Sequence, residues 1–533
     1  MLSQVVGMKI LLLDKETTGL LSVVSTQTYL LSKDTYLVDK LENTKRETMK
    51  HLKCIVFIRP SDSSITSLAQ ELLNPKYESY YIFFSNTIKK SVLETLAEHD
   101  EFEVVREIQE FYADYFAVLP NMYSLGMISE NYPSVYRSDI WDDVSLTRAT
   151  QGLMSLFLSL KTKPFMIRYE ANSNLGRQLA KELSVYRKND PLTPLLKQWT
   201  YLAMIHDLFG INNGRVDLSN VIGIRPEYKE IVLSTEQDEF LRKSVHLNFG
   251  DLGISIKDYV NSFQQASQTN QKLESIADMK SFVENYPEFR KLSGNISELE
   301  QSLACTERFQ ADYNGLKDII NNNKIRFEEK LCCALIFILR NEKSQPQIIS
   351  ELKGLLINVG FSAEILQFEL EFEKIIDLLL DYAGYRKRQG DLFKNENLFS
   401  RGKSVIRGLK GVDNVYTQHT SNYIETLVNL VRGRQSTKID NMLPIYPGYK
   451  SESSNMDNSG MNKNTTNSRQ MMMNNGPLSN QTIIVFFVGG VTFAEEADIS
   501  KFKAETLESN VELIIGGTDI INIKIFMNQI AQT

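Results

Sequence analysis

The stretch KILLLD, residues 9–14, opens a series of short apolar runs that decides the fold of this chain. YLVDK (36–40), CIVFIRP (54–60) and YYIFFSN (80–86) continue the series, and polar segments that permit helices separate the runs. Short continuous apolar runs are typical of strands buried on both faces, as in a parallel sheet covered by helices. We therefore expect an α/β domain with strands in Ile10–Leu13, Tyr36–Val38, Cys54–Ile58 and Tyr80–Phe84.

The carboxyl ends of these expected strands carry no catalytic signature. Ligands of open α/β sheets usually bind at this edge, yet the sequence there has no glycine fingerprint, phosphate loop or nucleophile elbow. Two glycine pairs, Gly489–Gly490 and Gly516–Gly517, lack the lysine and the serine or threonine of a phosphate loop, and tight strand–helix turns explain them better. We therefore expect a protein that works through its surfaces and is not an enzyme.

The composition argues against several functional classes. The net charge of the 533 residues is −7 and the pI is about 5.6, so no basic excess is present to bind nucleic acid. The five histidines show no metal-ligand spacing and the four cysteines form no Cys-x-x-Cys pair. Asp139, Asp142 and Asp143 fit a loop or helix cap better than a cation site. We expect no metal, no cofactor, and buried free thiols in a reducing compartment.

The sequence shows neither a signal peptide nor a spanning helix. The first apolar run lacks a basic segment before it and ends at Asp14. Leu331–Leu339 and Ile483–Ala494 are the longest apolar stretches, and both are shorter than the roughly 20 residues that a bilayer requires. We expect a cytoplasmic protein that reaches membranes through its partners.

Changes in pattern divide the chain into five segments. Residues 1–120 form a first α/β domain, residues 121–230 begin a second, and residues 231–450 are mostly helical. Residues 451–481 are rich in Asn, Ser and Met, and we expect them to be disordered because they have little to bury. Residues 482–533 contain two more α/β units. Since strands this apolar need neighbours, we expect them to return to the second domain, with the helical region as an insertion.

One segment of the helical region carries a narrow apolar stripe. Phe289, Leu292, Ile296, Leu299 and Leu303 alternate steps of three and four residues. Pro287 interrupts the helical pattern just before the stripe, because proline removes an amide donor and clashes with the preceding turn. Two interpretations stay open: a helical hairpin with a breakable point that offers its stripe to a partner, and an ordinary hairpin packed in the core.

Several long blocks, in the same order, resemble the SM family of vesicle-fusion regulators. They are KILLLDKETT, LKCIVFIRP, NPKYESYYIFFSN, DPLTPLLKQWTYLAMIHDLFGINNGRVDL, FGDLGISIKDYVNSFQ, GLKGVDNVYTQHT and IIVFFVGGVTFAEE. The resemblance implies a three-domain arch with parallel sheets in domains 1 and 2 and a largely helical domain 3 inserted into domain 2. It implies a non-enzymatic chaperone that binds syntaxin-type SNAREs and promotes SNARE assembly.

Resemblance to one branch of the family implies more specific partners and a cellular location. They are a trans-Golgi or endosomal syntaxin, a vesicle SNARE helix, and an endosomal tether that is linked to a Rab GTPase. The protein would associate peripherally with Golgi, endosomal and vacuolar membranes. A second interpretation stays open, in which the protein is an endosomal tether or Rab-effector scaffold that holds syntaxin without templating assembly.

The resemblance also implies binding residues. It implies a pocket on the outer side of domain 1 that receives the syntaxin N-terminal peptide. In the matching segment 91–111, Leu93 and Val105 would form its apolar walls and Glu110 would meet a basic residue. The alternative is that Leu93 and Val105 only pack helix on strand. The loop NTKRETMKHLK (43–53) resembles a syntaxin contact, which makes Lys45 and Arg46 candidates.

The same family resemblance gives the helical stripe a role. It implies that Pro287, Leu292, Ile296 and Leu299 belong to an element that templates SNARE helices. A heptad-like stripe can supply anchors for a partner helix that has heptads of its own.

Overall fold

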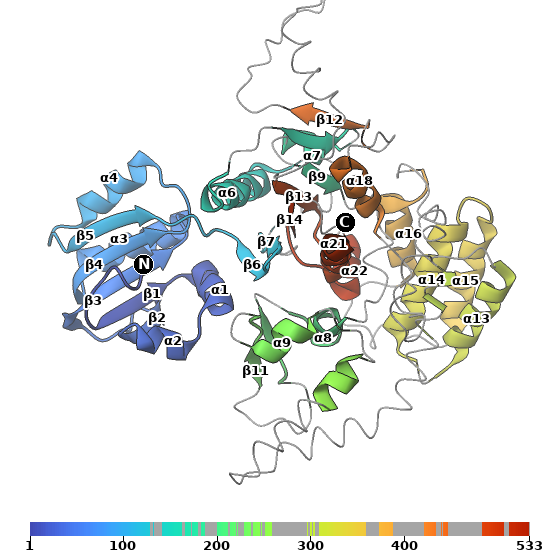
Figure 1. Ribbon diagram of the computed structural model, residues 1–533, viewed down its shortest axis with the longest axis horizontal. Coiled ribbons are helices and arrows are strands. Elements are labelled where there is room, and N and C mark those ends of the chain that lie inside the picture. Colours follow the sequence, from blue (N-terminus) through green and yellow to red (C-terminus); the bar gives the residue numbers. More distant parts are fainter. Residues whose placement is uncertain are drawn as a thin grey trace, which may run out of the picture.

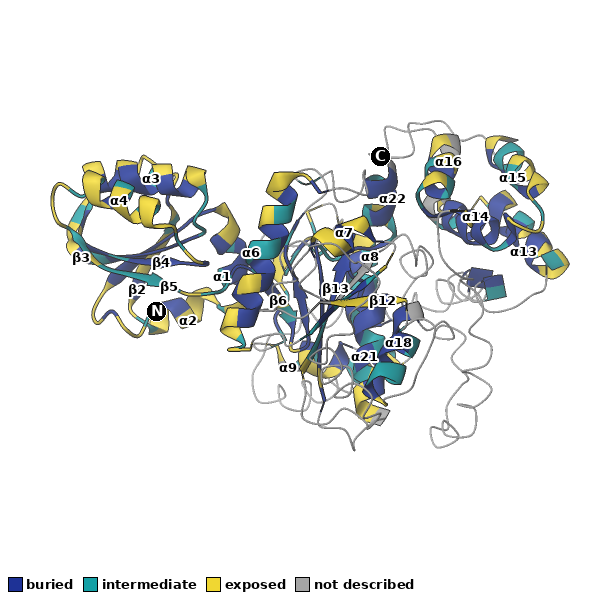
Figure 2. Cartoon of the chain, turned by 90° about the horizontal axis from the view of Figure 1, so that it is seen from above, coloured by how far each residue is buried: buried dark blue, intermediate teal, exposed yellow. Residues whose placement is uncertain are grey.

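A computed structural model describes residues 1–127, 132, 141–162, 166–171, 173–179, 183–186, 200–211, 214–219, 221, 229–235, 238–245, 247, 251–257, 296, 299–300, 302–303, 309–323, 325–358, 372–386, 421–432, 439, 441–445, 482–505 and 511–531. Pro287, Leu292 and the segment 451–481 lie outside these residues, so the expectations for them stay predictions. Domain 1 lies at one end of the molecule, a helical part at the other, and a second sheet between them (Figures 1 and 2).

Domain 1 is built on a five-stranded parallel sheet with the order β2-β1-β3-β4-β5. Its strands are β1 Lys9–Leu13, β2 Thr35–Lys40, β3 Met49–Ile58, β4 Tyr77–Phe84 and β5 Val105–Glu110. The helices between them are α1 Lys15–Val24, α2 Gln27–Ser32, α3 Asp62–Leu73 and α4 Lys90–His99. Alternate residues of the central strands pack against α3 and α4 on one face and α2 on the other, which explains their continuous apolar runs.

The two edge strands depart from the sequence expectation. Tyr36, Leu37 and Val38 are exposed because β2 closes one edge of the sheet, whereas their apolar run predicts burial on both faces. β5 closes the other edge, and its sequence VREIQE contains no apolar run, so the pattern did not predict it. Edge strands need less apolar surface than central ones, and therefore their composition indicates strands poorly.

The second sheet joins strands from distant parts of the chain. Its order is β12-β8-β9-β13-β14-β7-β6. The strands are β6 Phe116–Leu119, β7 Met122–Ser124, β8 Ile167–Glu170, β9 Leu183–Tyr186, β12 Met442–Ile445, β13 Thr482–Val488 and β14 Glu512–Gly517. β13 pairs in parallel with β9, and β14 with β7, so the C-terminal segment does return to this sheet. β6 and β12 also belong to it, although the expected boundaries put residues 116–119 in domain 1 and 442–445 in domain 3.

Helices cover both faces of the second sheet. α6 Asp143–Ser159 and α7 Asn174–Gln178 pack on one face; α8 Tyr201–Phe209, α18 Asn422–Val431 and α21 Phe493–Glu505 pack on the other. α9 Glu239–Ser244 adjoins α8, and β10 Arg215–Asp217 pairs antiparallel with β11 Glu230–Val232. Asp142 caps α6 by accepting from the Ser145 amide at 2.8 Å, in agreement with its interpretation as a cap.

The glycine pairs are structural, but in two different ways. Gly489 and Gly490 have φ values of 100° and 98° and form the turn after β13, as expected. Gly516 and Gly517 lie within β14 itself, which corrects the expectation of a second turn. A Cβ on Gly516 would lie 2.3 Å from the Tyr123 ring, so the missing side chain lets this ring pack directly on the strand.

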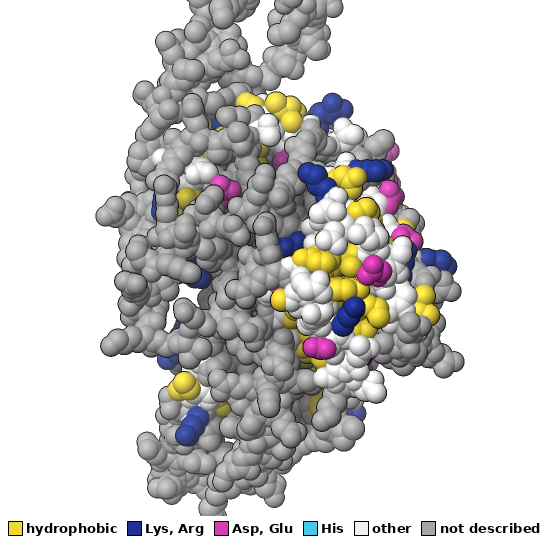
Figure 3. Space-filling view, turned by 90° about the vertical axis from the view of Figure 1, so that its right-hand side faces the viewer, with side chains coloured by type: hydrophobic (Ala, Val, Ile, Leu, Met, Phe, Trp, Pro, Cys, Tyr) yellow, Lys and Arg dark blue, Asp and Glu magenta, His cyan; other side chains and the backbone are white. Residues whose placement is uncertain are grey.

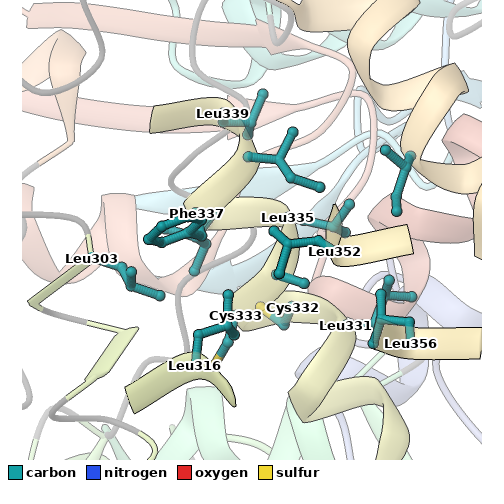
Figure 4. Packing of buried hydrophobic residues seen from close by; sticks show 14 of the residues in the cluster. Leu303, Leu316, Leu331, Cys332, Cys333, Leu335, Phe337, Leu339, Leu352 and Leu356 are labelled. Carbon is teal, nitrogen blue, oxygen red and sulfur yellow. The ribbon is translucent and has the colours of Figure 1, made fainter. Parts of the chain in front are cut away.

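The helical part contains α13 Phe309–Asn321, α14 Phe327–Asn341, α15 Gln347–Asn358 and α16 Phe372–Ala383. Every residue of the apolar stretch Leu331–Leu339 in α14 is buried, as expected of a helix that is apolar all round. Figure 4 shows Leu303 and Leu316 beside this helix, which carries Cys332, Cys333 and Phe337. Within the described segments, no helix is long and apolar enough to cross a membrane.

The outer surface of the helical part mixes residue types. Figure 3 faces this side of the molecule and shows hydrophobic side chains among charged ones on its described part. α22 Ile523–Ala531 packs against α16 and completes the same core from the C-terminal end of the chain.

Candidate partner-binding surfaces

The first candidate surface is formed by α4 and β5 at the edge of domain 1. β5 pairs in parallel with β4, and a bulge between Val105 and Glu107 shifts the register. Because of this bulge, Val105 is opposite Tyr80, and Glu110 is opposite Phe84; Tyr80 and Phe84 both belong to the core on the α3 and α4 side. The structure thus brings Leu93 of α4, Val105 and Glu110 to the same face of domain 1.

Leu93 and Val105 differ in how far their side chains are exposed. Leu93 is 37 % exposed, while Leu96 one turn later is buried in the core. Val105 is partly buried against that core, with its neighbours Val104 and Ile108. Leu93 is therefore an apolar side chain at the surface beside a strand edge, and packing of helix on strand accounts for Val105 but not for the exposure of Leu93.

Glu110 is held in place by two hydrogen bonds. Its Oε1 accepts from the Ile88 amide at 2.9 Å, which ties the end of β5 to the loop before α4. Its Oε2 accepts from the Tyr112 hydroxyl at 2.8 Å, and this bond raises the pKa of Tyr112. Five residue steps along the strand lead from Val105 to Glu110, or about 16 Å, which is the span of an extended peptide of about five residues.

The surface around Leu93 is acidic. Residues 89–110 contain seven carboxylate residues and three Lys or Arg residues. Glu94, Glu98, Glu101 and Glu103 are exposed. An exposed apolar side chain with an acidic surround suits a short peptide that carries an apolar anchor and basic residues.

Two residues of this surface escaped sequence reasoning. The Asp100 carboxylate accepts from the amides of Val104 at 2.9 Å and Val105 at 3.1 Å, so it fixes the turn that leads into β5. Phe102, at the tip of that turn, is 61 % exposed. Its position between Glu101 and Glu103 is the signal that indicates exposure, since an aromatic flanked by charges does not fit a core pattern.

The second candidate surface contains Lys45 and Arg46, which follow β2. Lys45 is exposed, but Arg46 is only 8 % exposed. The Arg46 guanidinium pairs with Glu71 at 2.5 Å and donates to the Leu41 carbonyl at 2.9 Å. Glu71 in turn accepts from the Tyr80 hydroxyl at 2.8 Å. Arg46 therefore holds the loop to α3 from inside, and only Lys45 presents its side chain to a partner.

The third candidate is the helical stripe, of which Ile296, Leu299 and Leu303 are described. All three are buried in the core of the helical part. Leu299 packs closely on α13, since a Cβ on Gly315 would lie 3.1 Å from its Cδ1. In this structure the described end of the stripe is core, so a partner helix could reach Ile296 and Leu299 only after this packing opens.

The chemistry of the described residues offers nothing else that resembles a reaction centre. No cluster of three His, Cys, Asp or Glu side chains within the described ranges is arranged to hold a metal ion. Cys54, Cys332 and Cys333 are buried, and burial raises the pKa of Cys54 well above its ordinary value. Cys305 lies outside the described residues.

The sequence and the fold agree with one protein family. The model of the Sec1 family matches residues 9–298 and 294–529. The chain belongs to the Sec1 family. It is 39 % identical to vacuolar protein sorting-associated protein 45 of Schizosaccharomyces pombe, over 99 % of this chain and 96 % of the relative. The protein of the same name from Homo sapiens is 37 % identical, over 98 % of this chain and 92 % of the relative.

A solved structure of this Sec1-family branch has the same fold. It is the SM protein Vps45 in complex with Qa SNARE Tlg2 (1-310), with a TM-score of 0.78 and 37 % identity over 98 % of this chain and 94 % of that chain. The predicted SM family, its branch and the predicted fold class are thereby confirmed. The roles of Leu93, Val105, Glu110, Lys45, Arg46, Pro287, Leu292, Ile296 and Leu299 in binding stay predictions.

Proposed function

We propose that this Sec1-family protein is a non-enzymatic chaperone that binds a trans-Golgi or endosomal syntaxin and promotes SNARE assembly for vesicle fusion and transport to the vacuole. The observation that carries the proposal is the match over nearly the whole chain to a protein whose solved complex contains a Qa SNARE. The lack of a reaction centre among the described residues is compatible with a role in binding.

The α4–β5 surface is the proposed docking site for the N-terminal peptide of the syntaxin. Leu93 supplies an exposed apolar contact, Val105 forms the wall beside it, and the acidic surround attracts basic residues of the peptide. Glu110, fixed by its two hydrogen bonds, keeps a negative charge at the far end of β5. Such a site would bind a short extended segment and leave the helical parts of the same partner to contact other surfaces, including the loop that carries Lys45.

The experiment that tests this proposal is binding of a fluorescent peptide from the N-terminus of Tlg2 to the purified protein and to Leu93→Arg. An arginine at this position replaces the apolar contact by a charge, and we expect affinity to fall at least about tenfold, or 1.4 kcal/mol. Leu31→Arg is the matched control, since Leu31 is an exposed leucine of α2 in the same domain. Equal losses in both variants, or no loss in Leu93→Arg, would place the peptide elsewhere.

Templating of a vesicle SNARE helix is the finer part of the proposed function. It assigns Pro287 to a bend that keeps the stripe folded inward, and Leu292, Ile296 and Leu299 to contacts made after it straightens. We predict that Pro287→Ala speeds SNARE assembly, measured by fluorescence energy transfer between labelled SNARE helices, because it removes the helix-breaking residue. An unchanged assembly rate would count against this switch.

One observation favours a second candidate function. Ile296 and Leu299 are 2 % and 9 % exposed, as expected if the stripe is only core. In that case the protein would hold the syntaxin as an endosomal tether or Rab-effector scaffold without templating. Both versions place the protein on Golgi, endosomal and vacuolar membranes through its partners, and the assembly assay with Pro287→Ala separates them.

A further inference from the structure

A buried polar cluster lies where domain 1 meets domain 2. Its centre is Asp114, in the segment between β5 and β6, which is 1 % exposed. Asp114 Oδ1 lies 3.1 Å from Arg59 Nε, and Oδ2 lies 3.3 Å from Arg148 Nη1. Asn86 Nδ2 donates to the same Oδ2 at 2.8 Å. One carboxylate thus joins a residue that follows β3, a residue that follows β4, and a residue of α6.

Helix α6 completes the cluster from the domain 2 side. Gln151 Oε1 accepts from Arg59 Nη2 at 2.7 Å, and the Gln151 carbonyl accepts from Asn86 Nδ2 at 2.9 Å. Ser155 Oγ accepts from the Asp114 amide at 2.9 Å. Three positions of α6, separated by three or four residues and therefore on one face, contact domain 1 directly.

An apolar contact accompanies the polar one. Leu20 and Val23 of α1 pack with Phe116 of β6, and Val118 lies against them. The chain also passes close to α1 at Gly214, where a Cβ would lie 2.8 Å from Val23 Cγ2. Among the described residues, domain 1 thus meets domain 2 through an apolar contact as well as through the hydrogen-bonded polar one.

The cluster lies at the edge of the domain 1 sheet where open α/β sheets usually bind ligands. Arg59 and Asn86 follow the carboxyl ends of β3 and β4, the edge at which open α/β sheets bind ligands. Here their side chains bond instead to Asp114 and to Gln151 of α6. Buried charges that are paired and hydrogen-bonded tolerate few geometries, because displacement of one partner leaves the others unpaired in a region of low dielectric.

We propose that Arg59, Asn86, Asp114, Arg148, Gln151 and Ser155, which we call the Asp114 joint, fix the orientation of domain 1 relative to domain 2. This inference rests on the proposed function in one respect: the fixed orientation lets one syntaxin contact the α4–β5 surface with its N-terminal peptide and the rest of the molecule with its helical region. In this proposal the six residues are positioning residues, which act by holding the two domains together.

A distance measurement tests the joint without any partner. Spin labels on Glu98→Cys in α4 and Lys501→Cys in α21 report the separation of the two domains; both positions are exposed, and Cys305→Ser removes the cysteine outside the described residues. Asp114→Asn keeps the shape but removes the charge between two guanidinium groups, and we expect a broader distance distribution than in the parent. Asp62→Asn, an exposed aspartate of α3, is the matched control and should leave the distribution unchanged. A distribution for Asp114→Asn as narrow as that of the parent would overturn the proposal.

Binding measurements then test the consequence. We expect Asp114→Asn to bind the fluorescent Tlg2 N-terminal peptide within twofold of the parent, and to lose about tenfold or more in affinity for Tlg2 (1-310). If Asp114→Asn bound Tlg2 (1-310) as tightly as the parent does, the link between the joint and two-site binding would be refuted. If the parent binds neither probe, the proposed function fails, while the distance measurement still decides the joint. Gln151→Ala, which removes one side-chain bond, replaces Asp114→Asn in both assays if that variant does not unfold cooperatively.

Discussion

Single buried polar side chains link several helices and strands of this protein through hydrogen bonds. Asp14 shows this well: its carboxylate accepts from the Thr17 amide at 2.8 Å, the Ser64 hydroxyl at 2.8 Å and the Arg59 amide at 2.7 Å. One side chain therefore caps α1 and ties it to α3 and to the end of β3. The sequence pattern predicts a strand that ends at this aspartate, but the Ser64 and Arg59 contacts depend on loops whose course the pattern does not define.

His206 is a buried residue that makes stability depend on pH. It is 2 % exposed, and its Nδ1 accepts from the Ile211 amide at 2.9 Å. Burial lowers the pKa of His206 from 6.5 to about 4. The unfolded chain therefore binds a proton below pH 6.5 that the folded chain does not bind until about pH 4, so stability from this group is complete above pH 6.5 and is lost as the pH falls.

We predict that the titration of His206 alone lowers the free energy of unfolding by about 3 kcal/mol between pH 7 and pH 4. His206→Asn keeps an acceptor for the Ile211 amide and does not titrate, so its stability should fall less over the same range, although it starts lower because the side chain is smaller. Urea unfolding at several pH values measures how the free energy of unfolding of each protein changes with pH. Parallel curves for the two proteins would show that His206 is not the titrating group.

At the scale of elements, sequence reasoning succeeds where burial is complete. The runs around Leu11, Val56 and Ile82 predict β1, β3 and β4 because these strands are covered on both faces. It fails to predict β5, whose sequence has no apolar run and whose residues are partly buried apart from the exposed Arg106. It predicts β2 as a strand, but its expectation that β2 is buried on both faces is wrong. For the candidate site, the sequence places Leu93 on a helix with Val105 and Glu110 downstream of it, but the bulge that brings both to the α4 face depends on pairing with β4.

Two glycines differ in the space around them, and this difference should decide whether a Gly→Ala substitution raises or lowers stability. Gly354 lies inside α15, and a Cβ there would meet nothing within 4 Å. We predict that Gly354→Ala raises stability by about 0.5–1 kcal/mol, because alanine favours helix interiors. Gly516→Ala should lower it by about 1–3 kcal/mol, because the added carbon would collide with the Tyr123 ring.

Thermal unfolding of the two glycine variants beside the parent protein is the measurement. The melting temperatures should move in opposite directions. Destabilisation by Gly354→Ala would mean that α15 is not helical at this position, and a neutral Gly516→Ala would mean that the Tyr123 ring has room to move.

At the scale of the whole molecule, the C-terminal helix connects two domains. α22 follows β14 of the second sheet, yet its side chains Phe526, Met527 and Ile530 belong to the core of the helical part. The Phe526 ring contacts Tyr382 of α16, with centroids 6.4 Å apart. The second sheet and the inserted helices are thereby joined by packing as well as by the chain.

We predict that Phe526→Ala lowers stability by about 3–5 kcal/mol, as expected for deletion of a buried aromatic ring. Hydrogen exchange should increase in α14 and α16 as well as in α22, because the lost contacts lie in their shared core. Val144→Ala, an exposed residue of α6, serves as the control and should change neither quantity. Faster exchange confined to α22 would show that the helical part does not depend on it.

The strand order of the second sheet determines when this sheet can form during translation. Its two central strands, β13 and β14, are among the last segments to be translated, whereas β6 to β9 emerge several hundred residues earlier. Until then β7 and β9 have no neighbours on their inner sides, and their unpaired backbone is open to wrong pairing. Domain 1, whose strands are all local, is complete long before. Nascent chains should therefore carry a finished first domain and an unfinished second one, and a premature stop codon anywhere before residue 482 would remove the middle of a sheet rather than its end.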